Sequence, residues 1–246
     1  VEEEKTLFSC DFLGAHYCEP YTFDYNMAYP AKYEIAFKGY YDAIFGPFKP
    51  YVLAGLEKIK NLPIERVCNS HGPIITKGCR LAYVLEKYNE WSQPQKNARL
   101  TVPVFYTSAY GNTRKIAAAI RDGILAARPE ADVETFDIID YDMGEMAERL
   151  NSSDAFALGS PTINGEAVPP AWMLLSHVDA INNKKKPVLV FGSYGWSGEA
   201  VPNLQTRLTG LKMKVFGDGL KVCFVPSGAD LEKAKALGTE FGASLA

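Results

Sequence analysis

The sequence of 246 residues lacks several patterns that would point to common protein classes. No stretch has enough consecutive apolar residues to cross a bilayer, and no signal peptide is visible. Only three histidines occur, and none belongs to a His-x-His or His-x-Glu pair of the kind that builds compact metal sites. The five cysteines contain no Cys-x-x-Cys, and their odd number argues against a complete disulfide framework. We therefore expect a cytoplasmic protein in a reducing compartment.

The sequence also has no large excess of charge of either sign. The 26 Lys and Arg residues nearly balance the 29 Asp and Glu residues, and the net charge of −3 predicts neither nucleic acid nor an anionic membrane as a partner. The length exceeds that of a single α/β domain of about 150 residues. A polar segment with a proline, Ser92–Asn97, predicts a short linker between a first domain (1–95) and a second domain (99–246).

The most informative segment is the loop after the apolar run Val102–Tyr106. A helical pattern begins at Thr113, so the segment predicts a strand, a small polar loop and a helix start. The first N–H groups of a helix have no partner within the helix, and the helix dipole there favours an anion. The predicted phosphate loop comprises Thr107, Ser108, Ala109, Tyr110, Gly111, Asn112 and Thr113.

This loop is neither a Walker loop, which needs Gly-Lys-Ser/Thr, nor the Gly-x-Gly-x-x-Gly dinucleotide loop. Hydroxyl groups without a lysine suit a single terminal phosphate without a metal, as in FMN. The alternative is an ordinary strand, turn and helix with a threonine cap.

Two further loops favour the flavin interpretation, because each follows a predicted buried strand (Ser153–Leu158 and Pro187–Phe191). In open parallel sheets, ligands bind at the carboxyl ends of the strands. Tyr194 and Trp196 have flat rings that suit stacking on a flavin. Asn164-Gly165 favours a turn, since both residues tolerate positive φ. The candidate residues are Ser160, Pro161, Thr162, Ile163, Asn164 and Gly165 in one loop and Ser193, Tyr194, Gly195, Trp196, Ser197 and Gly198 in the other.

The second domain alternates strands with helices, which predicts a doubly wound α/β fold with a parallel sheet in the order 2-1-3-4-5. A further strand is expected at Val133–Ile138, and a last strand at Lys214–Val225 is interrupted by Gly217-Asp218-Gly219. Helices are expected at Pro169–Val178, Ala200–Leu208 and Ala229–Leu245.

The first domain has little sheet of its own. Two strands are predicted, at Thr6–Ser9 and Ile64–Cys68, with helices at Ala31–Phe45, Lys49–Ile59 and Lys77–Trp91. Asp11 and His71 each follow one of these strands, a position typical of metal ligands. The alternative for each is a turn cap, and two ligands do not make a firm metal site.

These segments together resemble the flavodiiron proteins, also called type A flavoproteins. The resemblance rests on Leu7–Phe12, Ser70–Ile74, Ser160–Asn164 and Tyr194–Gly198, and it covers the whole chain. It implies the C-terminal part of a metallo-β-lactamase-like αββα domain followed by a flavodoxin-like FMN domain. In that family a rubredoxin-type donor reduces the flavin, and two irons reduce O2 to water or NO to N2O.

The resemblance places Asp11 and His71 at the family's bridging Asp and last His. The family's His-x-Glu-x-Asp-His motif, which precedes the position of Asp11, does not occur in this sequence. We therefore expect a di-iron centre only if another polypeptide, either the missing front segment or a second chain, supplies further ligands. The family also implies a head-to-tail homo-oligomer. The remaining alternatives are a flavodoxin-like electron carrier without a catalytic iron site and, with less support, an FMN-dependent quinone reductase.

Overall fold

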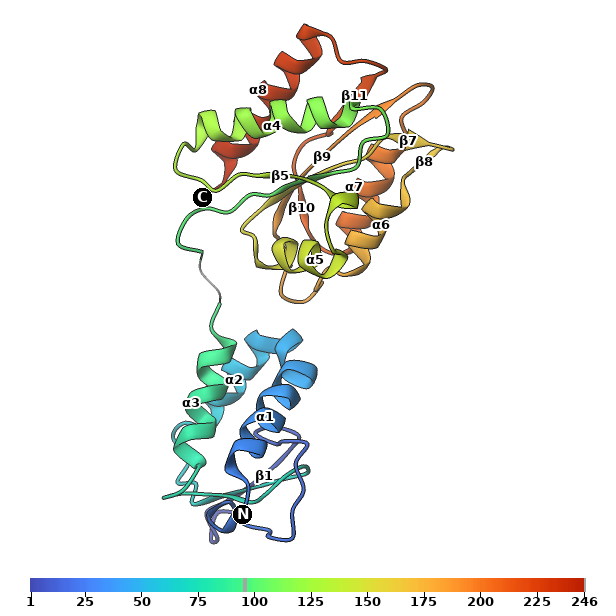
Figure 1. Cartoon of the computed structure of the whole chain (residues 1–246). Coiled ribbons are helices and arrows are strands. Elements are labelled where there is room, and N and C mark those ends of the chain that lie inside the picture. Colours follow the sequence, from blue (N-terminus) through green and yellow to red (C-terminus); the bar gives the residue numbers. More distant parts are fainter. Residues whose placement is uncertain (95–96, 246) are drawn as a thin grey trace. The chain divides into compact units, whose positions relative to one another are not determined.

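The computed structural model describes residues 1–94 and 97–245, and the chain divides into two compact units, Val1–Pro94 and Gln95–Ala246 (Figure 1). The predicted linker includes positions 95 and 96, which lie outside the described residues. Within the described residues, no helix combines the length and the apolar character needed to cross a membrane.

The second unit is built on a parallel sheet whose order confirms the prediction. The order is β5 (Thr135–Asp137), β4 (Val104–Tyr106), β6 (Phe156–Gly159) and β9 (Pro187–Tyr194), followed by β10 (Lys214–Val215) and β11 (Leu220–Cys223). Both of the last two strands pair with β9, so they form one interrupted fifth strand as predicted. Every pairing in this sheet is parallel.

Alternate residues of the central strands enter two separate cores, because successive side chains of a strand point to opposite faces. Phe156 and Leu158 join one core, whereas Ala155 and Ala157 join the other. Helices cover both faces, so the strands read as unbroken apolar runs. The core that contains Phe156 is covered by α5 (Met143–Ser152), α6 (Pro169–Ser176) and α7 (Ala200–Gly210), and the other by α4 (Asn112–Ala127) and α8 (Gly228–Ser244) (Figure 1).

Several boundaries differ from those expected. Helix α5 had no counterpart in the sequence analysis, although Asp142 caps it by accepting hydrogen bonds from the N–H groups of Gly144 and Glu145. The expected strand Val133–Ile138 shortens to β5 and continues as a 3-10 turn, Ile138–Asp140. The second loop contains an additional hairpin, β7 (Thr162–Ile163) with β8 (Glu166–Ala167).

Helices α4 and α8 lie side by side and approach closely because glycines line their contact. A Cβ at Gly123 would overlap with the carbonyl oxygen of Lys235, and one at Gly238 would overlap with that of Ile120. The two helix backbones therefore touch without intervening side chains.

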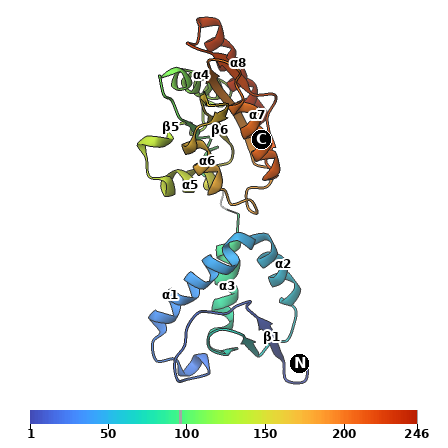
Figure 2. The same ribbon diagram turned by 90° about the vertical axis from the view of Figure 1, so that its right-hand side faces the viewer.

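The first unit has a sheet of three strands rather than two. β1 (Thr6–Cys10) pairs in parallel with β2 (Arg66–Asn69), and the unexpected β3 (Ile75–Thr76) pairs antiparallel with β2. The helices are α1 (Pro30–Tyr40), α2 (Lys49–Ile59) and α3 (Leu81–Ser92), which lie above the sheet in Figure 2. The expected helix Ala31–Phe45 is divided, because its last turn widens into a π-turn, Tyr41–Phe45, before a 3-10 turn at Gly46–Phe48. A further 3-10 turn spans Asp24–Asn26.

The core of the first unit is rich in aromatic rings. Tyr33, Phe37, Tyr41 and Tyr88 are fully buried there, whereas Phe8 on the edge strand β1 is largely exposed. The three-stranded sheet thus covers one aromatic cluster, and β1 is an edge strand of the sheet as far as the described residues show.

We predict that Gly123→Ala destabilises the second unit by about 1–3 kcal/mol, because the added methyl group forces α4 and α8 apart. Hydrogen exchange of α4 and α8 amides in increasing urea measures this free energy. Gly210→Ala is the matched control, since a Cβ at this end of α7 meets nothing within 4 Å. Equal stability of the two variants would contradict the close packing.

Candidate functional site

The three loops of interest begin at one edge of the parallel sheet. Tyr106 of β4 pairs with Gly159 of β6, and Gly159 pairs with Phe191 of β9, so the strands end in register. The Thr107 N–H donates to the Gly159 carbonyl at 3.1 Å, and the Ser160 N–H donates to the Phe191 carbonyl at 3.2 Å. These bonds extend the sheet into the loops and hold their first residues together.

The first loop presents the start of α4 to this edge. The helix begins at Asn112, one residue before the expected start, and Gly111 adopts the left-handed conformation at its N-cap, with φ of 80°. The Ser108 hydroxyl accepts from the Arg114 N–H at 3.3 Å. Among the described residues, the N–H groups of Gly111, Asn112 and Thr113 have no hydrogen-bond acceptor. Together with the helix dipole, these donors favour an anion.

The hydroxyl groups of Thr107 and Thr113 have different environments. Thr107 Oγ1 is buried and has no hydrogen-bond partner within the described chain, an arrangement that costs free energy unless a ligand satisfies it. Thr113 Oγ1 lies 2.9 Å from Ser193 Oγ, and both side chains are buried. Thr113 therefore links the first loop to β9, while Thr107 retains an unused hydroxyl. The residues present fit an oxygen-rich anion such as a phosphate.

The second loop is braced by its own side chains. Asn164 and Gly165 have φ of 54° and 71°, which confirms the predicted turn. The buried Ser160 hydroxyl donates to the Pro161 carbonyl at 2.8 Å and accepts from the Val168 N–H at 3.0 Å. Thr162 Oγ1 accepts from the N–H of Ala200 at 3.2 Å, which ties the hairpin to the start of α7. The hydroxyl groups of this loop thus serve bonds within the protein.

The third loop carries an uncovered aromatic ring. Trp196 is 93% exposed, and Tyr110 of the first loop is 89% exposed. Gly198 has φ of 75°, and a Cβ there would lie 3.1 Å from the Tyr194 ring, so only glycine fits without strain. Large exposed aromatics on loops at a sheet edge are suited to stacking on a flat ligand.

Arg114 is a charged residue of this edge that the sequence analysis did not include. Its guanidinium group donates to the Tyr106 hydroxyl at 3.2 Å and to Asp137 at 3.3 Å. Burial raises the pKa of Asp137, and the bond from Arg114 opposes this rise. The sequence does indicate Arg114, because this residue directly follows the hydroxyl-rich loop. Its partner Asp137 lies on β5, far from Arg114 in sequence, so the pair itself could not be predicted.

In the first unit, Asp11 and His71 lie together as expected. The parallel pairing of β1 with β2 continues into the Ser70 N–H bond to the Cys10 carbonyl at 2.7 Å, so the two strand ends meet. His71 Nε2 is 3.4 Å from Asp11 Oδ1, and both side chains are about half exposed. The His16 ring lies 5.2 Å from that of His71 and helps line a pocket of about 500 Å³.

This pair does not amount to a metal centre in the described part of the chain. No group of three or more His, Cys, Asp or Glu side chains there is placed to hold a metal ion. Iron sites need several ligands with supporting hydrogen bonds. The residues present therefore do not fit a di-iron centre on their own.

Known proteins resemble the chain along its whole length. A family model described as Flavodoxin matches residues 104–238. The flavo-diiron protein FprA2 of Clostridium acetobutylicum is 48% identical over 100% of this chain and 61% of its own length. The anaerobic nitric oxide reductase flavorubredoxin of Aeromonas hydrophila is 31% identical over 98% of this chain and 48% of its own.

Among solved structures, the rubredoxin oxygen:oxidoreductase of Desulfovibrio gigas matches 99% of this chain and 60% of that chain, with 26% identity and a TM-score of 0.64. The chain thus spans no more than 61% of the length of each of these three proteins. The matched part includes both units described above.

We predict that the isolated chain retains far less than two irons, because no group of three or more His, Cys, Asp or Glu side chains in residues 1–94 and 97–245 is placed to hold a metal ion. The chain is incubated anaerobically with Fe(II), desalted and analysed for metal. The double variant Asp11→Asn/His71→Gln should retain the same small amount. Two irons that survive desalting and are lost in the variant would contradict this prediction.

Proposed function

Because the chain belongs to the flavodiiron, or type A flavoprotein, family, we propose that it binds FMN at the sheet edge and carries electrons from a rubredoxin-type donor. The observation that supports this most directly is the loop before α4, which contains the unsatisfied Thr107 hydroxyl and ends in helix N–H groups without an acceptor among the described residues. FMN, when bound, stores one or two electrons and so connects a one-electron donor with a multi-electron acceptor.

The first loop, residues 107–113, would hold the phosphate. Its backbone N–H groups and the Thr107 hydroxyl donate to phosphate oxygens, and Arg114 adds positive charge nearby. The hydrogen bond between the hydroxyl groups of Thr113 and Ser193 holds this loop against β9.

The other two loops would flank the flavin ring. Residues 160–165 contain the Asn164-Gly165 turn, whose peptide groups would hydrogen-bond a ring edge. Residues 193–198 present Trp196 for stacking. The bonds that brace Ser160 and Thr162 keep the hairpin in place, so that ligand binding needs little ordering of the protein.

We further propose that the electrons pass to a site that includes Asp11 and His71 and reduces O2 to water or NO to N2O. One relative is named a nitric oxide reductase, and one structural neighbour is named a rubredoxin oxygen:oxidoreductase. The further ligands would come from sequence that the matched relatives contain and this chain lacks, or from a second chain. A head-to-tail homo-oligomer would bring the FMN of one subunit to the acceptor site of another.

A second candidate function is a flavin electron carrier without a catalytic iron site. In the described part of the chain, Asp11 and His71 do not form part of a group of three or more side chains placed to hold a metal ion, which favours this function for the chain alone. Iron content and O2 or NO consumption, measured with and without a complementing polypeptide, separate the two. An FMN-dependent quinone reductase leaves the first unit without a role.

We predict that the chain binds about one FMN and that Thr107→Val weakens binding. The binding free energy should become less favourable by about 1.5–3 kcal/mol, the cost of losing a hydrogen bond to a charged group. Isothermal titration calorimetry measures this difference. Without FMN, this variant should be at least as stable as the parent chain, since Thr107 Oγ1 makes no bond there.

Thr113→Val is the matched comparison, because it leaves Ser193 Oγ without its buried partner. This variant should lose stability even without FMN. Unchanged FMN affinity in Thr107→Val would place the phosphate elsewhere, and a colourless protein that ignores FMN would contradict the proposal itself.

We also predict that Trp196 borders the flavin ring, so that its fluorescence is quenched when FMN binds. The exposed ring should become covered by the ligand. Trp196→Phe should remove most of this quenching and shift the flavin reduction potential. Trp172→Phe is the control in the same unit, and it should leave the quenching of Trp196 unchanged. Trp172 packs against the core that contains Phe156. Quenching that persists in Trp196→Phe would refute the assignment.

A further inference from the structure

The sheet edge that carries the candidate phosphate loop also holds a buried carboxylate. Tyr106 of β4 and Asp137 of β5 are register partners, so their side chains lie on the same face of the sheet. Only 4% of Asp137 is exposed, and its Oδ1 atom has no hydrogen-bond partner among the described residues. A buried carboxylate of this kind needs a cation nearby.

Arg114, the third residue of α4, supplies that cation. Its Nη2 donates to Asp137 Oδ2 at 3.3 Å, and its Nε donates to the Tyr106 hydroxyl at 3.2 Å. These two contacts hold the guanidinium group at the sheet edge, although the side chain is 61% exposed. A helical side chain leans toward the N-terminus of its helix, so the group lies toward the end of α4 where the N–H groups lack acceptors within the described chain.

The fixed guanidinium group keeps donors in reserve. A guanidinium has five N–H donors, and Arg114 uses two of them for Tyr106 and Asp137. The other three have no acceptor within residues 1–94 and 97–245. Two N–H groups of one guanidinium can donate in parallel to two oxygens of a phosphate. Arg114 therefore retains the donors that a terminal phosphate accepts.

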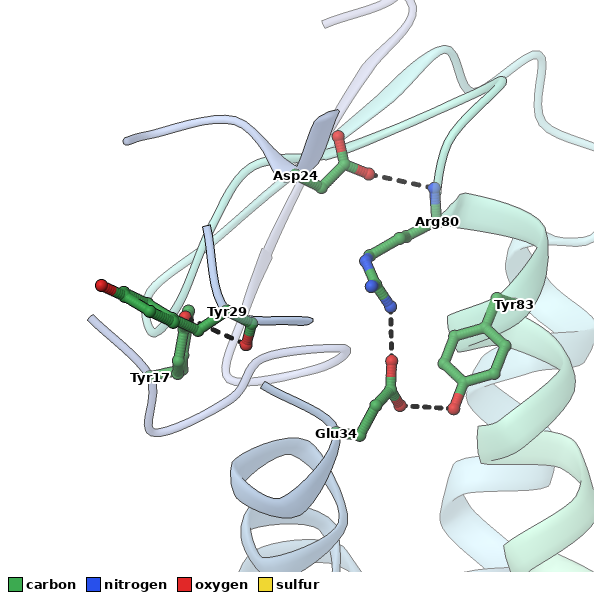
Figure 3. Close-up of polar contacts among 6 residues, drawn as sticks. All are labelled: Tyr17, Asp24, Tyr29, Glu34, Arg80 and Tyr83. Atoms are coloured by element: carbon green, nitrogen blue, oxygen red, sulfur yellow. Dashed lines mark hydrogen bonds and ion pairs between the residues drawn. The ribbon is translucent and has the colours of Figure 1, made fainter. Parts of the chain in front are cut away.

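A trio of the same residue types in the first unit is enclosed. Arg80 donates to one oxygen of Glu34 at 2.5 Å, and the Tyr83 hydroxyl donates to the other (Figure 3). The Arg80 guanidinium carbon also lies 5.0 Å from the ring centroid of Tyr33, and its side chain is 19% exposed. The contrast favours a structural role for Arg80 and a ligand-binding role for the open Arg114.

The charge of Arg114 bears on which phosphate the loop prefers. A phosphate monoester carries a charge of about −1.5 to −2 at neutral pH, whereas a phosphate that is esterified on both sides has a single negative charge. Backbone N–H groups can donate to either. A fixed cation adds a Coulomb attraction that grows with the charge of the ligand, so it favours the monoester.

We propose that Arg114, positioned by Asp137 and Tyr106, makes the first loop selective for a dianionic terminal phosphate. The site would take FMN in preference to riboflavin, which lacks a phosphate, and to FAD, whose phosphates form an internal bridge. This inference rests on the proposed binding of FMN and adds the residue that decides between related flavins. Asp137 and Tyr106 act only through Arg114.

Isothermal titration calorimetry of the flavin-free chain with FMN, riboflavin and FAD tests the proposal. Arg114→Gln should weaken FMN binding about 10- to 100-fold, which corresponds to a lost hydrogen bond to a charged group. Riboflavin binding should not change. Arg114→Lys should restore part of the preference for FMN, because lysine keeps the charge but not the planar pair of donors. Lys115→Gln is the matched control, because it removes a neighbouring exposed cation from the same helix.

The loss of Arg114 also leaves the Asp137 carboxylate without its cation, which by itself lowers stability. The substitution is therefore repeated in Asp137→Asn, where FMN affinity should again fall relative to Asp137→Asn alone. Tyr106→Phe removes the other acceptor of Arg114. It should lower the ratio of FMN to riboflavin affinity about 2- to 10-fold with riboflavin binding unchanged, which a purely structural role of Tyr106 would not produce.

An affinity ratio of FMN to riboflavin that Arg114→Gln leaves unchanged would overturn the inference, as would a parent chain that binds FAD as tightly as FMN. In both cases the chain would still bind a flavin, so the proposed function would stand. A parent chain that binds none of the three flavins would contradict the proposed function and this inference with it.

Discussion

Hydrogen bonds between β6 and its parallel neighbours β4 and β9 place Tyr106, Gly159 and Phe191 in register, and the candidate flavin site depends on this pairing. Helices bury both faces of the sheet, which leaves the carboxyl ends of its strands as the place for a ligand. A slip by one residue would exchange the side chains of the two cores. The same constraint that stabilises the unit therefore brings the three loops together.

In the loops at this edge, some polar groups hydrogen-bond within the protein, whereas others have no partner among the described residues. The hydroxyl groups of Thr113 and Ser193 join the first loop to the third. That of Thr162 joins the second loop to the start of α7, and that of Ser160 bonds within its own loop. Close glycine contacts add to this rigidity, since a Cβ at Gly192 would overlap with the Ser160 carbonyl oxygen. The helix N–H groups and the exposed rings belong to these braced loops. Ligand binding should therefore cost little conformational entropy of the protein.

The first unit is organised by aromatic packing around a small sheet. Parallel pairing of β1 with β2 brings Asp11 beside His71, as parallel pairing in the second unit does for the three candidate loops. Its aromatic core, however, also connects that pocket to α3 through Tyr33.

The local patterns were sufficient for the strand order, the interrupted last strand and the Asn164-Gly165 turn. They were insufficient for β3, because a strand of two residues gives no periodic signal. Helix α5 is different, because it has a capping Asp142 and buries Met146, Ala147 and Leu150 on one face, so the sequence does carry a signal for it.

Residue types and chain order by themselves determined which loops carry hydroxyl, glycine and aromatic side chains, because the backbone preferences of these residues act over a few positions. Only the tertiary structure decided that the Thr113 hydroxyl is bound to that of Ser193, while the Thr107 hydroxyl has no hydrogen-bond partner among the described residues. It alone brought Arg114 to Asp137 and Glu34 to Tyr83. Such pairs join distant segments, and their geometry depends on how whole strands and helices pack rather than on the residues next to them in sequence.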